Sequence, residues 1–246
     1  MAVFRCGRET IKYLTAVFML FGHIGGMFFE NLVLIVYICN ALGSLAPVMV
    51  CLFCAEGFVY THSRKKYIIT MLIFAAVSQL PYMLATGENN LNMLFTLALS
   101  FASLWSLETL KIKHAVAVVC ACVLVSVLCD WMILPPILTI LFRYLYLSDR
   151  DKSISHQKKY ALFIIPLLIA IGEFIVNAQN PEYALFVSLG GFLGSLLAIM
   201  IILFLYTGKK NSGSPHPGGG VSKWFFYVFY PAHFAVLYLI KYLIIL

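Results

Sequence analysis

The sequence predicts an all-α polytopic membrane protein with about nine transmembrane helices and a cytoplasmic N-terminus. Of its 246 residues, 62% are apolar and 11% are charged, whereas a soluble domain has about 25% charged residues. The mean hydropathy is +0.94. No ordinary domain interior hides this much apolar surface, so a soluble enzyme and a disordered tail are both excluded.

The helices are predicted from the apolar runs. A bilayer core about 30 Å thick requires about 20 apolar residues per helix. Runs of this kind cover residues 11–29, 32–60, 67–86, 91–110, 114–129, 131–147, 160–178, 183–206 and 224–246. The first run has no small-residue cleavage site after it, so we expect a retained span. We expect Pro47, near Gly43, to kink the long second helix, and Pro135 with Pro136 to break the start of the sixth.

The basic residues predict the topology, within a single membrane domain over residues 1–246. With the N-terminus inside, the inner segments hold 16 of the 17 Lys and Arg residues. These are Arg5, Arg8, Lys12, Arg64, Lys65, Lys66, Lys111, Lys113, Arg143, Arg150, Lys152, Lys158, Lys159, Lys209, Lys210 and Lys223. The outer loops hold Glu30, Glu88, Asp130 and Glu182 and no cation, with Lys241 near the outer end of the last helix. The short helical pair around Asp130 is either two spans or a re-entrant pair.

The net charge of +7 favours the lipid bilayer as partner, not nucleic acid. The seven cysteines are odd in number and mostly lie in apolar runs, so neither a disulfide framework nor a redox site at Cys51-x-x-Cys54 is expected. No metal is expected either, because no histidine pair has ligand spacing and the carboxylates are scattered. The Gly-, Ser- and Pro-rich segment 208–220 is predicted to be a mobile linker.

Seven polar residues lie within or near the predicted spans, where ionisable groups are costly and are functional candidates. They are His23, Glu56, Gln79, Asn92, Asp130, Glu173 and His233. His23 lies 11 residues after Lys12, about 16 Å along a helix. His233 follows Tyr230 and Pro231 at a similar depth, and an imidazole can take and return a proton at neutral pH.

These residues have two interpretations. The two histidines either meet in one cavity or only hydrogen-bond neighbouring helices. Asn92 either caps the fourth helix or lines the outer mouth of that cavity together with Gln79. Glu56 is either an ion-pair partner of the nearby cations or a site residue. The predicted depths place His23, Gln79, Asn92 and Asp130 in the outer half of the membrane.

Four stretches then occur in a fixed order along the chain. They are IKYL at 11–14 with HIG at 23–25; EGF at 56–58 with THSRKKY at 61–67; SQLPY at 78–82 with Asn92 and LFTLAL at 94–99; and KWFFYVFYPAH at 223–233. In combination they resemble the TraX family, named for the conjugation protein associated with N-terminal acetylation of F-type pilin.

The resemblance implies a multi-pass acetyltransferase of the bacterial plasma membrane. It would move an acetyl group from acetyl-CoA to an amine or hydroxyl of a peptide, pilin-like or envelope acceptor. His23 would be the general base, and His233 would assist it or orient the acceptor. Arg64, Lys65 and Lys66 would hold the phosphates of acetyl-CoA. Asn92, Gln79, Glu56 and Tyr230 would contact the acceptor.

Two departures from the family pattern affect this expectation. Gly22 stands where members usually carry Asp before the histidine, and Ser44 stands where they usually carry Arg after a glycine. Loss of both the Asp and the Arg suggests that they form a buried ion pair in other members and that the pair is removed here as a unit. Either Asp130 takes over the orienting role, or the chemistry is altered. The alternative function is a non-enzymatic membrane carrier, or a changed relative that binds an envelope or pilin-like partner.

Overall fold

The computed structural model describes residues 6–29, 32–147, 157–208 and 221–245. Within these ranges the chain is helical, and all nine predicted runs contain helix. The helices are α1 (Arg8–Phe28), α2 (Val33–Gly43), α3 (Leu45–Tyr60), α4 (Arg64–Thr86), α5 (Met93–Thr109), α6 (Ile112–Ser126), α7 (Leu134–Leu141) with the π turn η1 (Phe142–Tyr146), α8 (Gln157–Tyr160), η3 (Ala161–Phe163), α9 (Ile164–Val176), α10 (Pro181–Met200) with the π turn η4 (Ile201–Leu205), and α11 (Val221–Ile245). The all-α prediction is confirmed.

In the part of the chain that the structure describes, five helical stretches are long and apolar enough to cross a membrane: Arg8–Phe28, Leu34–Tyr60, Arg64–Thr86, Pro181–Leu205 and Trp224–Ile244. Four apolar helices are shorter: Met93–Thr109, Ile112–Ser126, Leu134–Tyr146 and Ala161–Val176. This agrees with a polytopic membrane protein, while the number of spans and their orientation stay predictions. The linker at 209–220, Arg5, Glu30, Arg150, Lys152, Lys209 and Lys210 lie outside the described residues.

The second predicted helix is divided one turn before Pro47, which agrees with the expected effect of this proline, because Pro47 has no N–H to donate to the Gly43 carbonyl. The break falls at Ser44, between α2 and α3, where the Ser44 N–H and hydroxyl both donate to the Asn40 carbonyl at 2.9 and 2.8 Å. Pro47 lies in the first turn of α3, where its missing N–H leaves no helical bond unmade. The Pro135–Pro136 pair lies in the first turn of α7 for the same reason, so the prediction of a helix start there is confirmed.

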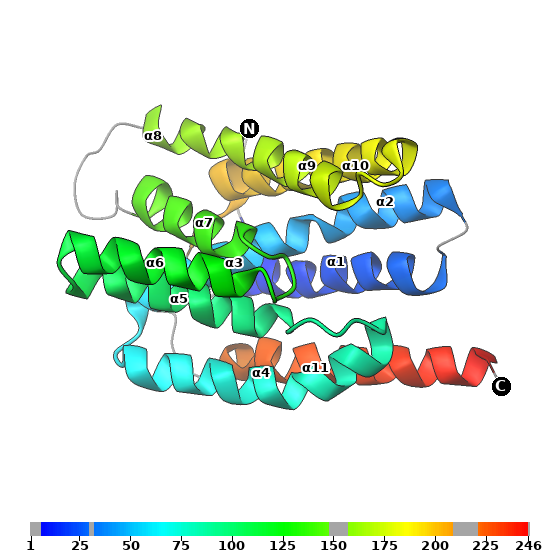
Figure 1. Cartoon of the computed structure of the whole chain (residues 1–246), viewed down its shortest axis with the longest axis horizontal. Coiled ribbons are helices and arrows are strands. Elements are labelled where there is room, and N and C mark those ends of the chain that lie inside the picture. The colour runs from blue at the N-terminus through cyan, green and yellow to red at the C-terminus, as the bar shows by residue number, and fades with distance from the viewer. Residues whose placement is uncertain (1–5, 30–31, 148–156, 209–220, 246) are drawn as a thin grey trace. The chain divides into compact units, whose positions relative to one another are not determined.

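The chain forms two compact units, each described by itself. Unit 1 comprises residues 1–50 and 155–226, and unit 2 comprises 51–154 and 227–246. In unit 1, α10 packs against both α9 and α2, and α2 packs against α1. Figure 1 shows α9 and α10 side by side, in yellow-green and yellow. Glycines make the approach of α2 and α10 close, because a Cβ on Gly194 would overlap the Ala41 carbonyl oxygen.

In unit 2, α5 is the central helix and packs against α4, α6 and α7. Ten of its residues are buried, including Phe101 and Leu104, which are fully buried. Its neighbour α6 buries only Ala115, Cys122 and Ser126. Helix α6 is therefore a peripheral helix whose remaining apolar side chains face outward, as expected for a lipid-exposed surface.

Candidate functional site

A buried polar cluster lies in unit 2 where α4 ends and α5 and α7 begin. Two short connecting segments, residues 90–92 and 128–130, form its backbone. The Leu91 N–H donates to the Leu128 carbonyl at 3.0 Å, and the Asp130 N–H donates to the Leu91 carbonyl at 2.6 Å. These two bonds form an isolated parallel bridge between Leu91 and Cys129. The bridge holds Asp130 beside the start of α5.

Asn92 occupies the centre of this cluster and is 0% exposed. Its side-chain oxygen accepts the Leu94 N–H at 3.0 Å and so caps α5. Its amide group donates to the Ala75 carbonyl at 2.8 Å and to Gln79 Oε1 at 2.9 Å. The capping interpretation is therefore correct for Asn92, and the predicted neighbours Asn92 and Gln79 are in direct contact.

Two further polar side chains extend the cluster from α4. Gln79 Nε2 donates to the Asn90 carbonyl at 2.9 Å, and the Tyr82 hydroxyl donates to Asn90 Oδ1 at 2.7 Å. Tyr82 is buried and lies within electrostatic range of Asp130. The cluster thus links the end of α4 to both connecting segments.

Helix α11 contributes Tyr230 and His233, which are 4% and 6% exposed. The Tyr230 hydroxyl oxygen accepts the Met93 N–H at 3.2 Å, and Tyr230 lies within electrostatic range of Asp130. The His233 ring packs against Tyr230, with 5.6 Å between centroids. His233 Nδ1 lies 3.0 Å from the Phe229 carbonyl. Because a carbonyl only accepts, Nδ1 carries the proton and the lone pair of the neutral ring is on Nε2.

Asp130 is held by an unusual backbone. The two residues after it, Trp131 and Met132, have φ values of 61° and 44°, a left-handed conformation that non-glycine residues rarely adopt. The Thr96 hydroxyl donates to the Asp130 carbonyl at 2.8 Å and anchors the turn to α5. Strained backbone persists only where the surrounding structure determines it, and it is common at functional sites.

Asp130 lies in the connection between α6 and α7, and its surroundings favour the protonated form. Burial raises the pKa of the carboxyl to about 6; the hydrogen bond from the Trp131 N–H opposes this rise, and the Glu88 charge adds to it. At a pH near 6 the carboxyl can therefore both accept and release a proton.

This shift predicts a pH-dependent stability. The pKa is higher in the folded protein than its ordinary value of 3.8, so the folded state binds an extra proton between pH 4 and 6. The free energy of unfolding should fall as the pH rises from 4 to 7, as measured by the melting midpoint in detergent. The Asp130→Asn variant should show a weaker decrease over this window, whereas the exposed control Glu182→Gln should keep the wild-type profile. Equal profiles for Asp130→Asn and wild type would contradict the assignment.

His23 lies in unit 1 on α1 and is half-buried. The other site residues predicted from the sequence lie in unit 2, so a cavity shared by His23 and His233 stays a prediction. A Cβ on Gly22 would lie 2.9 Å from the Gly43 Cα, so α1 and α2 touch backbone to backbone next to His23. Of the two positions that depart from the family pattern, Gly22 contacts Gly43 of α2, whereas the side chain of Ser44 lies beside Gly191 and Gly194 of α10.

The predicted phosphate-binding cations lie at the start of α4. Arg64 forms an ion pair with Glu108 at 2.7 Å, and Glu108 also accepts two bonds from Arg143 at 3.0 and 2.8 Å. Lys65 and Lys66 are exposed. Glu56 is buried on α3 at 1% exposure and interacts electrostatically with Tyr146. The observed acidic partner of Arg64 is thus Glu108, which the sequence reasoning did not select.

Two further features bear on the chemistry of the molecule: groups of metal-binding side chains, and pockets outside the polar cluster. Among the residues that the structure describes, no group of three His, Cys, Asp or Glu side chains could hold a metal ion.

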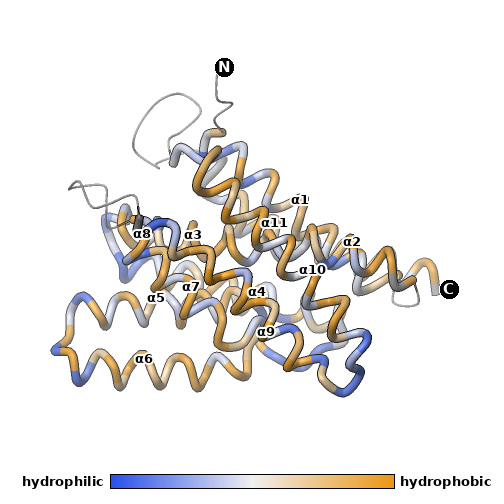
Figure 2. The backbone as a smooth tube through the Cα atoms, turned by 90° about the horizontal axis from the view of Figure 1, so that it is seen from above, coloured by the Kyte–Doolittle hydropathy of each residue, from blue (hydrophilic) through white to orange (hydrophobic). Residues whose placement is uncertain are grey.

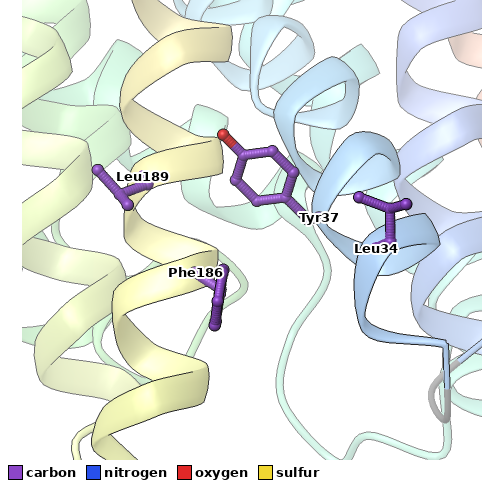
Figure 3. A pocket seen from close by; sticks show the side chains of 4 residues that line it. All are labelled: Leu34, Tyr37, Phe186 and Leu189. Atoms are coloured by element: carbon purple, nitrogen blue, oxygen red, sulfur yellow. The ribbon is translucent and has the colours of Figure 1, made fainter.

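An open groove of about 470 Å³ in unit 1 is lined by Leu34 and Tyr37 of α2 and by Phe186 and Leu189 of α10 (Figure 3). Its lining is almost entirely apolar, and it includes none of the predicted site residues.

Fold and site together define an all-α integral membrane protein with a buried polar cluster. The chain belongs to the TraX protein family, whose model matches residues 7–241 and thus extends through both units. It is similar to the probable fimbrial assembly protein FimC, serogroup H1, of Dichelobacter nodosus, with 27% identity over 213 residues that cover 80% of each chain. No solved structure matches the chain.

Proposed function

We propose that this protein is an acetyltransferase of the bacterial plasma membrane that moves an acetyl group from acetyl-CoA to an amine or hydroxyl of a pilin-like, peptide or envelope acceptor. The observation that carries the proposal is the cluster of the buried side chains Tyr82, Tyr230 and His233 with the half-buried Asp130, in a chain that is 62% apolar. Placing ionisable groups there costs stability, and such groups are characteristic of functional sites. The likeness to a probable fimbrial assembly protein supports a pilin-like acceptor.

In the proposed reaction the acceptor nitrogen or oxygen attacks the thioester carbonyl carbon. His23 takes the proton of the acceptor, the carbon–sulfur bond breaks, and coenzyme A leaves as a thiolate that is then protonated. Asp130, Tyr230 and His233 hold and orient the acceptor, together with the amides of Gln79 and Asn92 and the Glu56 carboxyl. The exposed ammonium groups of Lys65 and Lys66 bind the phosphates of acetyl-CoA, and Arg64 contributes through its charge while it pairs with Glu108.

The test uses the purified full-length protein in detergent with acetyl-CoA labelled in the acetyl group. We expect coenzyme A release, transfer of label to a peptide with a free N-terminus, and a raised melting midpoint with coenzyme A, because a ligand that binds only the folded state stabilises it. Acetyl-pantetheine, which lacks the nucleotide phosphates, is the matched donor control and should be used less well. If the protein neither releases coenzyme A nor shows a shift of its melting midpoint, the proposal is overturned. That result would favour the non-enzymatic alternative.

A further inference from the structure

The turn between α5 and α6 alternates apolar and cationic side chains. The order along the chain is Leu110, Lys111, Ile112 and Lys113. Leu110 is 46% exposed and Ile112 is 70% exposed, and both lysines are exposed as well. In Figure 2 hydrophilic residues appear at this turn, whereas the helices that it joins are mostly hydrophobic. We call residues 110–113 the basic turn. Its side chains present cations and hydrocarbon on one short segment.

The lengths of the two helices restrict how far the basic turn can reach. Helices α5 and α6 have 17 and 15 residues, which correspond to about 26 and 23 Å at 1.5 Å per residue. Both are shorter than a hydrocarbon core about 30 Å thick. We expect a turn on helices this short to lie at the level of the lipid headgroups instead of projecting into water. The flexible lysine stems let the ammonium groups reach the phosphates from that level.

Among the residues of unit 2 that the structure describes, neither Lys111 nor Lys113 forms an ion pair. The nearest acidic residue in the chain, Glu108, is already neutralised by Arg64 and Arg143. Lys111 and Lys113 lie at the N-terminal end of α6, where the helix dipole disfavours cations, so they do not stabilise the helix. With respect to the described residues, their positive potential is therefore available to an anion outside the protein.

We infer that the basic turn binds the headgroup phosphate of an anionic phospholipid, with Leu110 and Ile112 inserted beside its acyl chains. A lipid supplies both the anion and the hydrocarbon that this alternation matches, whereas a free nucleotide supplies only the anion. The inference concerns a different segment from the proposed acetyl-CoA site and stands independently of the proposed enzymatic activity.

The test measures the melting midpoint of the full-length protein in detergent during titration with dioctanoyl phosphatidylglycerol or dioctanoyl phosphatidylcholine. We expect phosphatidylglycerol to raise the midpoint at a much lower concentration. A lysine near an anionic surface contributes about fivefold in affinity, so the Lys111→Gln/Lys113→Gln double variant should need about 30-fold more phosphatidylglycerol. Lys241→Gln, which removes a cation from α11, is the control and should behave as wild type.

Three outcomes would overturn the inference. They are equal responses to the two lipids, an unchanged phosphatidylglycerol titration in the double variant, and displacement of phosphatidylglycerol by coenzyme A. The last result would assign the basic turn to the donor nucleotide. A double variant with a lower starting midpoint stays informative, because the concentration at half-response and not the midpoint itself is compared.

Discussion

Replacement of His23 by glutamine should reduce acetyl transfer by about 10²- to 10⁴-fold, the usual contribution of a positioned general base. Glutamine keeps a polar side chain of similar size on α1 but cannot take a proton from the acceptor. The loss should appear in kcat, with an unchanged midpoint shift by coenzyme A, because donor binding at Lys65 and Lys66 does not involve this residue. The measurement is single-turnover release of coenzyme A in the presence of an acceptor peptide.

The matched controls are two other histidines. His114→Gln, at an exposed position in the first turn of α6, should leave transfer unchanged. His233→Gln should mainly raise the acceptor KM, because the proposed role of His233 is to orient the acceptor. If His23→Gln retains transfer within about twofold of wild type while His233→Gln loses it, the base is on α11 and the assignment of His23 is wrong.

The helices could be predicted from the sequence because a single strong pattern, the apolar run, determines each of them. Their ends could not, because these depend on individual side chains. The α2–α3 break falls at Ser44, three residues before Pro47, because Pro47 cannot donate to the Gly43 carbonyl. The apolar run begins at Leu91, but α5 begins at Met93, with Asn92 as its N-cap. Leu91 is not part of the helix because its backbone forms the bridge with Cys129.

The candidate site was predicted in part. Depth along the helices indicated that Gln79 and Asn92 lie at one level, and their contact agrees with that. Tyr82, Asn90 and Thr96 lie at the same predicted level but were not selected as site residues, because their roles depend on the backbone path at 90–92 and 128–130. Asn90 in the outer loop and Thr96 one turn after Asn92 were the available signals. The left-handed backbone at Trp131 and Met132 gives no signal in the sequence, since neither residue type favours it.

The largest expected stability effect is that of Gly194→Ala on α10. The added Cβ would overlap the carbonyl oxygen of Ala41 and lie 2.9 Å from its carbonyl carbon and 3.2 Å from the Ser44 Cβ. These are backbone atoms and a Cβ, so relief requires α2 and α10 to move apart. That movement would also stretch the 2.9 Å bond from Asn40 Nδ2 to the Val187 carbonyl. Overpacking of this kind costs about 3 kcal/mol, which corresponds to a melting midpoint lower by about 6–12 °C.

Gly26→Ala on α1 is the matched control for this clash. A Cβ there has no atom within 4 Å apart from its own helix, so only the intrinsic preference of the helix for alanine remains. The midpoint of this variant should equal that of wild type or exceed it, by up to about 1 kcal/mol in free energy. Midpoints for the two variants within 2 °C of each other, measured in the same detergent at about the same protein concentration, would contradict the packing of α2 against α10. A decrease confined to Gly194→Ala would instead show that the two helices approach backbone to backbone.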